Sequence, residues 1–495
     1  MEQQLSSIVG FLENKTILVT GSTGFVAKVF VEKVLRIQPN IKKLYLLLRA
    51  ADSASATKRL YDEILGKELF SVLKEKWGSD LSSLVDEKVV VPVAGDIAHE
   101  DLGVKDDNLK TEMFSEIDAV INLAATVNFD ERYDVALGIN TLGPKHILDF
   151  AKQCSHLKVF VHVSTAYVCG EKGGLVMEAP FKMGETLNGT CDLDISNELR
   201  LMENKLQQLT ADKLAEKAIT RAMKDFGNER ARKFGWPNTY VFTKSMGEML
   251  IGQQRGEMPL VILRPTIVTS TFKEPFPGWI EGIRTIDSLA IAYGKGRLNC
   301  FLGDPNSTID LIPADMVVNS IIVAMAVHAD KPGETVYQVG SSRRNPIKFS
   351  QIPGMGYNHF SQKPWIGKDG KPVVVGPVKI MGSMDTFHRY VYVRYLLPLK
   401  ALEFANIVSC HYFDGVYGNS KRKIDIVMRL VELYRPYLFF KAIFDDKNTD
   451  KLRMTARKSC DPADMFYFQF DPKCVDWDDY VANTHLPGAV KHIYR

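Results

Sequence analysis

The chain of 495 residues is long enough for two or three domains of roughly 150 residues each. Hydrophobic residues make up 45% of the sequence and charged residues 24%, which is the balance of an ordinary globular protein and excludes a disordered chain. The net charge of +3 gives no support for a nucleic-acid partner, because such proteins usually carry a concentrated basic face.

The seven cysteines and the first residues of the chain bear on its compartment. The cysteines are scattered, odd in number and without a Cys-x-x-Cys pair, which predicts reduced thiols and neither a disulfide framework nor a metal site. The start, MEQQLSSIVGFLENK, has no basic run, no long apolar run and no arginine, so we expect neither a secretory signal nor a plastid transit peptide. The apolar stretch 316–329 is shorter than the ~20 residues of a spanning helix and predicts a buried helix on a sheet. We therefore expect a cytoplasmic protein.

Apolar runs alternate with helical patterns along most of the chain. Near-continuous apolar strands separated by helices are typical of a parallel sheet that is covered on both faces. Because crossovers between parallel strands are right-handed, the sequence predicts an α/β fold with a Rossmann-type, doubly wound sheet. The predicted strands are 16–21, 43–49, 88–97, 118–125, 158–168, 259–268 and 334–340.

Three segments depart from this pattern. Residues 196–235 are rich in Lys, Glu, Arg, Leu and Ala, which predicts a helical insertion, either a charged surface helix pair or a lid over a long substrate. Residues 270–333 are expected to form a smaller substrate region. After residue 356 the pattern becomes aromatic, apolar and dotted with Arg and Lys, which predicts a mainly helical C-terminal domain over 357–495.

A glycine-rich turn follows the first predicted strand. Gly21, Gly24 and Ala27 form a G-x-x-G-x-x-A pattern before a predicted helix. Gly21 permits the tight turn, Gly24 lets the backbone approach a pyrophosphate, and the small Ala27 lets the helix pack close to the sheet. The free N–H groups at the start of the helix can then bind phosphate, so residues 10–356 are predicted to bind a dinucleotide. The turn residues expected to contact it are Thr20, Gly21, Thr23, Gly24 and Phe25.

Arg49 ends the second predicted strand. Proteins that bind NADH usually have an acidic residue at this position, about 20 residues beyond the glycines, and its carboxylate hydrogen-bonds the ribose hydroxyls. A guanidinium pairs with phosphate in two-pronged fashion, so Arg49 predicts NADPH as the cofactor, unless it is an ordinary surface arginine. Asp96 ends the third strand, where its carboxylate can accept a hydrogen bond from the adenine amino group. The other predicted cofactor contacts are Ile97, Ala124, Ala125, Lys244 and Pro265.

Tyr240 and Lys244, in TYVFTKSMGEML, are one helical turn apart on one face. Reducing a carbonyl requires hydride on carbon and a proton on oxygen, and we expect Lys244 to lower the pKa of Tyr240 from its usual value of about 10. Thr165 lies at the carboxyl end of a strand, where its hydroxyl can hold the carbonyl oxygen; Ser164 is the alternative, since only one of the two should face the site. Asn140 is expected either to tie its helix to a proton-relay water or to serve in capping or packing.

These features resemble the extended short-chain dehydrogenase/reductase superfamily: TGxxGxxA, the strand-end Ser-Thr, Tyr-x-x-x-Lys and the RPT of 264–266. A narrower resemblance covers nearly the whole chain. The segments NKTILVTGSTGFVAK, VHVSTAYV, YVFTKSMGE, FKEPFPGWIEG, DLIPADMVVN and, near the C-terminus, DWDDYVANTHLPGAVKH are similar to the alcohol-forming fatty acyl-CoA reductases, in particular the plant branch.

The resemblance implies that NADPH reduces a long-chain fatty acyl-CoA to a bound aldehyde and then to a primary alcohol, with release of coenzyme A, as in wax or suberin biosynthesis. It implies that Tyr240 is the proton donor, that Lys244 positions the ribose and tunes the phenol, and that Thr165 orients the substrate oxygen. The C-terminal helices suit the wall of an acyl tunnel, a peripheral contact with a membrane such as the endoplasmic reticulum, or a plain helical core.

Two other functions fit parts of the sequence. A superfamily relative acting on a sugar nucleotide, an epimerase or dehydratase, would use the same Tyr240, Lys244 and Thr165 but would normally bind NAD and would not need the apolar C-terminal part. A non-catalytic subunit that binds NADPH could keep the glycine turn but need not keep those three residues together.

Overall fold

The computed structural model describes residues 7–78, 81–282, 285–298, 300–367, 369–459 and 466–493. The chain divides into two compact units. Unit 1 joins Met1–Ile283, Asp310–Asn345 and Ile443–Arg495, and unit 2 joins Arg284–Ile309 and Pro346–Ala442. Each unit therefore contains residues that are far apart in the sequence.

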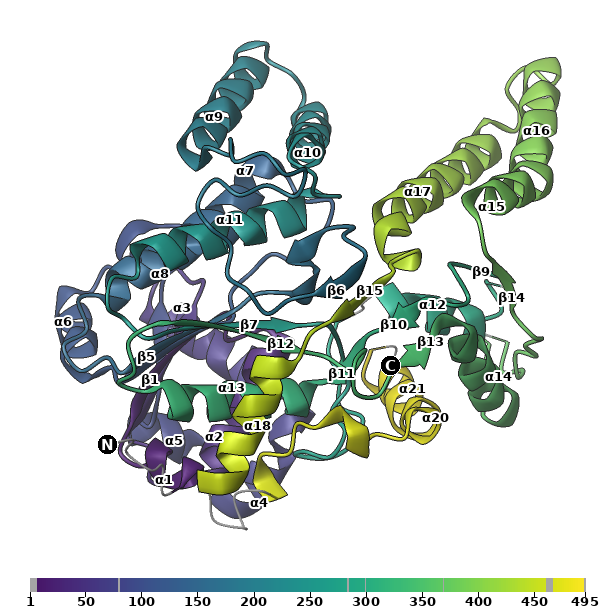
Figure 1. The fold of residues 1–495 in the computed structure, drawn as a ribbon. Coiled ribbons are helices and arrows are strands. Elements are labelled where there is room, and N and C mark those ends of the chain that lie inside the picture. Colours follow the sequence, from purple (N-terminus) through teal and green to yellow (C-terminus); the bar gives the residue numbers. More distant parts are fainter. Residues whose placement is uncertain are drawn as a thin grey trace. The chain divides into compact units, whose positions relative to one another are not determined.

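Unit 1 is built on a parallel sheet of seven strands (Figure 1). All seven predicted strands are present and every neighbouring pair is parallel, so the predicted α/β fold with a doubly wound, Rossmann-type sheet is confirmed. In sheet order the strands are β12 (Glu334–Val339), β7 (Leu260–Pro265), β5 (Val159–Val163), β4 (Ala119–Asn122), β1 (Thr16–Thr20), β2 (Lys43–Leu48) and β3 (Val90–Ala94).

Helices cover both faces of this sheet. On one face α8 (Gly143–Ala151) packs against α11 (Thr239–Gln254), and on the other α13 (Ala314–His328) packs against α2 (Phe25–Ile37). Since α13 also contacts β5 and β7, the stretch 316–329 is the buried, sheet-packed helix that its sequence predicts. Among the described residues, no helix combines the length and apolar character needed to cross a membrane.

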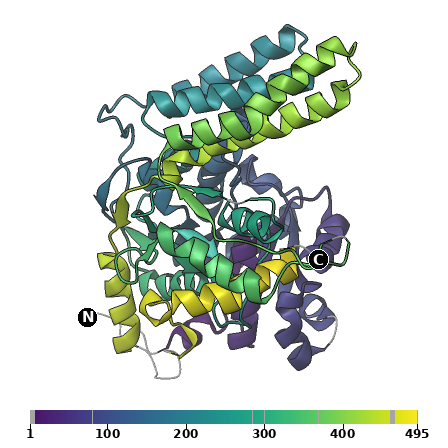
Figure 2. The same ribbon diagram turned by 90° about the vertical axis from the view of Figure 1, so that its right-hand side faces the viewer.

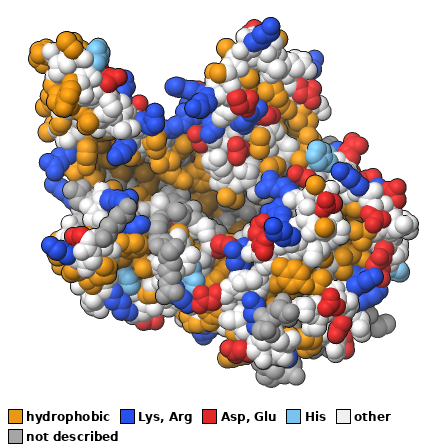
Figure 3. Space-filling view, turned by 180° about the vertical axis from the view of Figure 1, so that it is seen from behind, with side chains coloured by type: hydrophobic (Ala, Val, Ile, Leu, Met, Phe, Trp, Pro, Cys, Tyr) orange, Lys and Arg blue, Asp and Glu red, His pale blue; other side chains and the backbone are white. Residues whose placement is uncertain are grey.

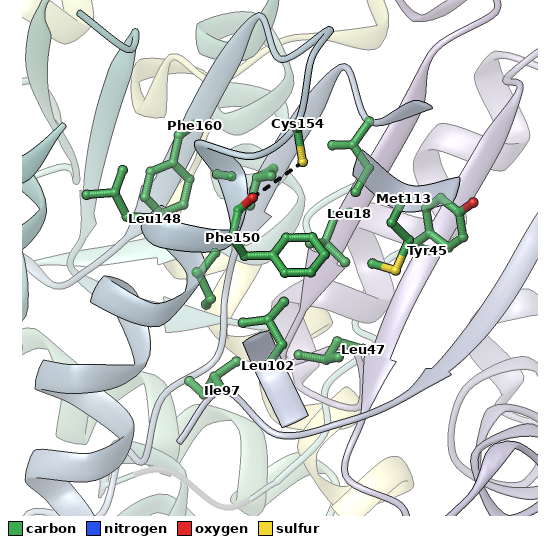
Figure 4. Packing of buried hydrophobic residues seen from close by; sticks show 14 of the residues in the cluster. Leu18, Tyr45, Leu47, Ile97, Leu102, Met113, Leu148, Phe150, Cys154 and Phe160 are labelled. Carbon is green, nitrogen blue, oxygen red and sulfur yellow. Dashed lines mark hydrogen bonds between the residues drawn. The ribbon is translucent and has the colours of Figure 1, made fainter. Parts of the chain in front are cut away.

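The core on the α8 face joins side chains from distant parts of the chain. Leu148 and Phe150 from α8 lie near Phe160 of β5, and Leu18 and Tyr45 extend the same cluster across β1 and β2 (Figure 4). Burying a large apolar side chain stabilises the fold by roughly 1.5–3 kcal/mol relative to leaving it exposed. This packing fixes the carboxyl ends of the strands, where most of the predicted site residues lie.

The predicted insertion 196–235 forms two helices, α9 (Ile195–Ala211) and α10 (Glu216–Lys233). Glu198 of α9 is fully buried because it accepts hydrogen bonds from Arg230 of α10 (Nε to Oε2, 2.9 Å) and from the Tyr133 hydroxyl (2.9 Å). The insertion is therefore tied to the body of unit 1 by a paired, buried charge. The further helices of this part are α1 (Ile8–Leu12), α3 (Ser53–Arg59), α4 (Ser71–Trp77), α5 (Ser82–Asp86), α6 (Asp107–Glu116) and α7 (Tyr133–Ala136).

Two elements end earlier than the sequence predicts. The predicted strand 158–168 stops as β5 at Val163, because the Thr165 hydroxyl accepts from the Tyr167 N–H (3.3 Å) and starts a 3-10 helix over Ala166–Cys169. The sequence of residues 58–77 has a continuous helical pattern, but the helix is broken at Gly66, whose N–H donates to the Tyr61 carbonyl (2.8 Å) and which leaves no room for a side chain. Local polar contacts thus override the apolar periodicity at both places.

The C-terminal residues belong to a different compact unit from residues 357–442. Residues from Ile443 onward belong to unit 1, so the compact units cross the predicted boundary at residue 356. Arg344 binds Asp471 with both Nε and Nη2 (3.2 Å each), and the Tyr480 hydroxyl donates to the Ser270 carbonyl (2.7 Å). These returning elements are β15 (Ala442–Phe444), α18 (Lys447–Ser459), α20 (Trp477–Asp479) and α21 (Leu486–Ile493), near which lie the short strands β6 (Gly174–Val176), β8 (Ile267–Thr269) and β11 (Leu311–Pro313).

Unit 2 is mainly helical, as the sequence predicts for this region. Its core is small and centres on Cys300, Leu302, Met381, Phe387 and Val391. Two of its helices, α16 (Leu397–Val408) and α17 (Asp414–Leu438), run side by side as a hairpin (Figure 2). The other elements are α12 (Thr285–Gly294), β9 (Cys300–Leu302), β10 (Thr308–Ile309), β13 (Ile347–Lys348), α14 (Ile352–Gln362), β14 (Lys379–Met381) and α15 (Met384–Val391).

Candidate active site

The glycine-rich turn between β1 and α2 has the geometry of a phosphate-binding loop. Gly21 has φ +65°, and a Cβ there would lie 2.7 Å from the Ala124 backbone, so only glycine fits. The Gly24 N–H donates to the Gly21 carbonyl (2.7 Å) and Gly24 caps α2 without a side-chain hydrogen bond. Because the first turn of α2 also carries no acid, its N–H groups are available to an anion such as pyrophosphate.

The flanking residues of this turn shape the same cradle. Ala27 is buried, as the close packing of α2 requires. Phe25 packs against Trp279 with 5.2 Å between ring centroids, and Thr23 is half-buried. The Thr20 hydroxyl donates to Asn122 (2.7 Å), which faces it from β4. The residues present therefore fit a dinucleotide.

The other predicted cofactor residues follow the carboxyl ends of neighbouring strands. Arg49 follows β2 and is exposed, and Ala124 and Ala125 follow β4 and are half-buried. Asp96 follows β3 and already accepts a hydrogen bond from the Ala98 N–H (3.0 Å), so one carboxylate oxygen is engaged. Ile97 is buried and Pro265 ends β7, while Lys244 lies on α11 and is described below. All of them lie along one edge of the sheet.

Tyr240 and Thr165 meet at this edge. Asn238 caps α11 by accepting from the Val241 N–H (3.2 Å), which starts the helix just before Tyr240. The phenol hydrogen-bonds the Thr165 hydroxyl, and its ring stacks on Phe129 (5.3 Å between centroids). Tyr240 is 9% exposed. The segments that follow β5 and β4 therefore both contact Tyr240 of α11, Thr165 at its hydroxyl and Phe129 at its ring.

Of Ser164 and Thr165, the structure places Thr165 against Tyr240. The Ser164 hydroxyl is buried and has no hydrogen-bond partner among the described residues, while its N–H still continues the sheet by donating to the Leu263 carbonyl (2.7 Å). This agrees with the alternation of side chains along an extended chain.

Lys244 is buried one turn beyond Tyr240. Its Nζ donates to the Val163 carbonyl (2.9 Å) and lies 3.4 Å from His162 Nε2. Burial lowers the pKa of Lys244 to about 8, and the nearby carboxylate of Glu248 acts in the opposite direction. Lys244 is therefore a weaker base than an ordinary lysine.

The prediction that Lys244 lowers the pKa of Tyr240 is wrong for this structure. Burial raises the pKa of Tyr240 to about 12, and the hydrogen bond with Thr165 opposes this rise only in part. The physical reason is that the ammonium is held by the Val163 carbonyl on β5, so loss of water around the phenol is the larger effect.

Asn140 lies in a π-helical turn (Leu137–Leu142) between α7 and α8. Its Oδ1 accepts from the Thr126 N–H (3.0 Å), and its Nδ2 donates to the Thr126 carbonyl and to the Thr243 hydroxyl (3.1 Å each). The side chain thus fastens α11 to the segment after β4, which corresponds to the packing alternative; a role in proton relay stays a prediction.

Two polar residues of the site escaped the sequence analysis. Asn122 in β4 and His162 in β5 are fully buried between Thr20 and Lys244 and are hydrogen-bonded to each other (2.9 Å). The signal that could have found them is the presence of an amide and an imidazole inside otherwise apolar strands, because buried polar groups need partners. Within the described residues no cluster of His, Cys, Asp and Glu suits a metal ion, and Cys460 lies outside them.

Comparisons with known proteins agree with this geometry. Two family profiles, both described as male sterility protein, match residues 19–321, as an NAD-binding domain, and 394–495. The chain is 57% identical to the alcohol-forming fatty acyl-CoA reductase of Simmondsia chinensis, over 99% of each chain. The chain belongs to the fatty acyl-CoA reductase family. Fatty acyl-CoA reductase 1 of Arabidopsis thaliana is 53% identical, again over 99% of each chain, so the resemblance to the plant branch is confirmed.

A solved structure supports the fold of this fatty acyl-CoA reductase family member. The terminal R domain of the myxalamid PKS-NRPS pathway aligns over 97% of this chain and 91% of its own, with a TM-score of 0.55 and 18% identity. At this identity the likeness concerns the fold alone. The family match makes the dinucleotide site a nicotinamide site.

Proposed function

We propose that the chain reduces long-chain fatty acyl-CoA to primary fatty alcohol in two NADPH-dependent steps, with the aldehyde held in the site between them. The observation that carries this proposal is the contact of the Tyr240 phenol with Thr165, one turn from buried Lys244, in a chain of this family. The epimerase and subunit alternatives lose support, because the relatives that align end to end are acyl-CoA reductases.

The three side chains divide the proton chemistry among them. A bound nicotinamide supplies hydride to the carbonyl carbon. The Thr165 hydroxyl accepts from the Tyr167 N–H, and its own proton, which faces the Tyr240 phenol, can turn to the substrate oxygen when a carbonyl binds between them. Tyr240, with its pKa raised to about 12, stays protonated at neutral pH and donates its proton as the oxygen gains charge. Lys244 is mostly an ammonium below pH 8 and can return a proton to the phenolate.

The same residues serve both reductions. In the first, the thioester carbon accepts hydride, its oxygen is stabilised by Thr165 and Tyr240, and cleavage of the C–S bond releases coenzyme A as the thiol and leaves an aldehyde. In the second, the aldehyde carbon accepts a second hydride and its oxygen takes the Tyr240 proton to give the alcohol. Two hydrides and two protons are consumed for each acyl-CoA.

The preference for NADPH rests on Arg49. Its exposed side chain follows β2, where an acid would favour ribose hydroxyls, and a guanidinium favours a 2′-phosphate. Arg59 approaches the same strand end, since its Nη1 donates to the Arg49 carbonyl (2.5 Å). Two guanidinium groups at this position attract an anionic ribose, although Arg59 also pairs with Glu63.

The α16–α17 hairpin of unit 2 is proposed to contact a lipid surface, on the cytoplasmic side of the endoplasmic reticulum. Its free end exposes Phe404, Ile407, Val408 and Tyr412 at 62–82%, and Figure 3 shows apolar side chains gathered there. A basic run, Lys421–Lys423, lies within the first half of α17. Exposed apolar groups with flanking cations suit an anionic membrane surface, from which an acyl-CoA with a long chain would be drawn.

Vesicle flotation tests this lipid contact. The protein should float with vesicles that contain anionic lipid, and the double variant Phe404→Ser/Ile407→Ser should not. The matched control is Val374→Ser, which removes an apolar side chain that is 92% exposed elsewhere in unit 2 and should leave flotation unchanged. Equal flotation of the double variant and the control would exclude the hairpin as the contact.

The reaction itself is tested with purified protein, NADPH and acyl-CoA substrates of increasing chain length. Extraction of the products should yield primary alcohols, with one acyl-chain range preferred. A product made only of aldehyde would refute the second reduction, and no consumption of any acyl-CoA would refute the proposal as a whole.

A further inference from the structure

A buried line of hydrogen bonds connects the cofactor turn to Lys244. The Thr20 hydroxyl at the end of β1 donates to Asn122 Oδ1 on β4 (2.7 Å). Asn122 Nδ2 lies 2.9 Å from His162 Nδ1 on β5, and His162 Nε2 lies 3.4 Å from Lys244 Nζ on α11. Thr20, Asn122 and His162 have no exposed surface, and Lys244 is 1% exposed. The line therefore runs across three adjacent strands inside the protein.

The orientation of the Asn122 amide is fixed from its other side. The Ala124 N–H donates to Asn122 Oδ1 (3.3 Å), and a backbone N–H can only donate. If the amide were rotated by 180°, its NH₂ group would face this N–H donor, the Thr20 hydroxyl would lose its acceptor, and the Ala124 N–H would keep only its 3.4 Å contact with the Thr20 hydroxyl. The orientation with the oxygen toward Ala124 and Thr20 and the NH₂ group toward His162 therefore satisfies more donors than the rotated one.

This orientation fixes the tautomer of His162. Because Asn122 Nδ2 donates, His162 Nδ1 must accept, and the single proton of the neutral imidazole is on Nε2. The Nε2–H then points at Lys244 Nζ. An N–H donor facing an ammonium is unfavourable, whereas an N–H donor facing an amine forms a hydrogen bond.

We infer that His162 is a positioning residue whose Nε2–H tautomer, imposed by Asn122, stabilises the amine form of Lys244 and so tunes the lysine as the proton carrier of the site. Both the ammonium and the amine of Lys244 can donate to the Val163 carbonyl, so this bond holds the side chain in place in either form. The contact with His162 differs between the two forms, because only the amine can accept the Nε2–H. Burial of His162 beside Lys244 also keeps the imidazole neutral, since both depress the pKa of His162 well below its usual value.

The other side chains around Lys244 do not favour its amine form, so we assign this effect to His162. Glu248, one turn along α11, favours the ammonium, but its carboxylate is bound by Arg264 of β7 (Nη2 to Oε2, 2.5 Å). Tyr240, one turn in the other direction, is neutral at physiological pH. The π-helical turn packed on α11 presents Asn140 and Thr141, which do not titrate.

The tautomer is measured directly by long-range ¹H–¹⁵N NMR on the wild-type chain labelled with ¹⁵N-histidine. His162→Gln identifies the signals of residue 162 by their absence. We expect Nε2 to carry the proton and the imidazole to stay neutral between pH 5.5 and 9, with at most a small shift of the Nε2 signal as Lys244 titrates near pH 8. A proton on Nδ1, or titration to an imidazolium within that range, would overturn the inference. This readout needs no turnover, so it is independent of the proposed reaction on which the proton-carrier role rests.

Asn122→Asp tests the functional consequence. A carboxylate accepts on every side, so it keeps the bonds from Thr20 and Ala124, draws the imidazole proton to Nδ1 and makes Nε2 an acceptor for the ammonium. The alkaline limb of kcat/KM should then move up by about one pH unit. The double variant Asn122→Asp/His162→Leu retains the charge without the imidazole. If the double variant shifts the limb as far as the single variant, or if neither shifts it, the tautomer has no such effect.

Discussion

The sheet of unit 1 buries its apolar side chains, whereas the α16–α17 hairpin of unit 2 exposes many of its own. Every residue of β1, β4 and β7 is buried, whereas α17 has no buried residue and α16 buries only Asn406. The sheet thus needs no further partner to be stable, and the hairpin leaves a large apolar surface uncovered. A surface of that kind marks an interaction site in a soluble protein.

Polar groups show the same contrast. In unit 1 several buried charged and amide side chains have a polar partner: Glu248 pairs with Arg264, Glu198 with Arg230, and Asn122 with His162. Such pairing holds catalytic side chains in one arrangement, since leaving a buried polar group unpaired is costly. The hairpin carries its charges in water, where pairing contributes little. The comparison supports the proposals that the chemistry takes place in unit 1 and that the hairpin serves binding.

The largest expected effect is on turnover when the proton donor is removed. Tyr240→Phe should lower kcat by about 10²–10⁴-fold, the range for loss of a general acid, and should leave the affinity for NADPH within a few-fold. The ring and its stacking on Phe129 are retained, so the loss is that of the hydroxyl alone. Steady-state kinetics with fluorescence titration of NADPH measures both. A variant that kept near-normal turnover would show that another group is the acid.

The stability contrast is tested by one matched pair of truncations. Leu18→Ala, in the buried centre of β1, should lower the free energy of unfolding by about 2–5 kcal/mol. Leu430→Ala, on α17 and 45% exposed, should change it by no more than about 0.5 kcal/mol. Urea denaturation followed by circular dichroism gives both values. Similar losses of stability for the two variants would mean that the hairpin is covered in solution, and would contradict the contrast between a buried sheet and an exposed hairpin.

Cofactor choice is tested at the edge of the same sheet. Arg49→Gln removes a charged contact worth about 1.5–3 kcal/mol, so the Kd for NADPH should rise about 10–100-fold while that for NADH stays the same. Lys152→Gln, a charge change at the C-terminal end of α8, is the control and should alter neither. If wild-type protein used NADH as well as NADPH, the assignment of Arg49 to the 2′-phosphate would be lost.

The smallest expected effect is on the pH dependence of reduction. Burial lowers the pKa of Lys244 to about 8, so the ammonium predominates below that pH and the amine above it. Because the ammonium returns the proton to Tyr240, kcat/KM should be constant from pH 6 to 7.5 and should fall above about 8. Lys244→Arg, which stays charged, should lose this limb even if its overall rate is low. A wild-type profile that is level to pH 9.5 would contradict the role of Lys244.

Much of unit 1 follows from local sequence patterns. All seven strands of the sheet were predicted, because apolar runs between helical patterns have few other structural solutions. The glycine turn was predicted because positive φ and close backbone approach, both present at Gly21, require glycine. Thr165 and Tyr240 were brought together by reasoning that strand ends meet at one edge of a parallel sheet, and they hydrogen-bond there.

What escaped prediction depends on contacts between distant segments. The return of residues 443–495 to unit 1 depends on pairs such as Arg344–Asp471 and Ser270–Tyr480, which no local pattern reveals. The pKa of Tyr240 depends on how deeply the phenol is buried and on where Lys244 Nζ is held, and helical spacing specifies neither. The role of His162 depends on the orientation of an amide on the next strand.

The most direct measurement counts NADPH against coenzyme A. With a saturating long-chain acyl-CoA, oxidation of NADPH is followed by absorbance and the freed thiol by a colorimetric reagent in the same sample. A site that carries out both reductions without losing the aldehyde predicts two NADPH oxidised for each thiol released, from the first turnover onward. A ratio of one, with aldehyde accumulating in solution, would contradict the account.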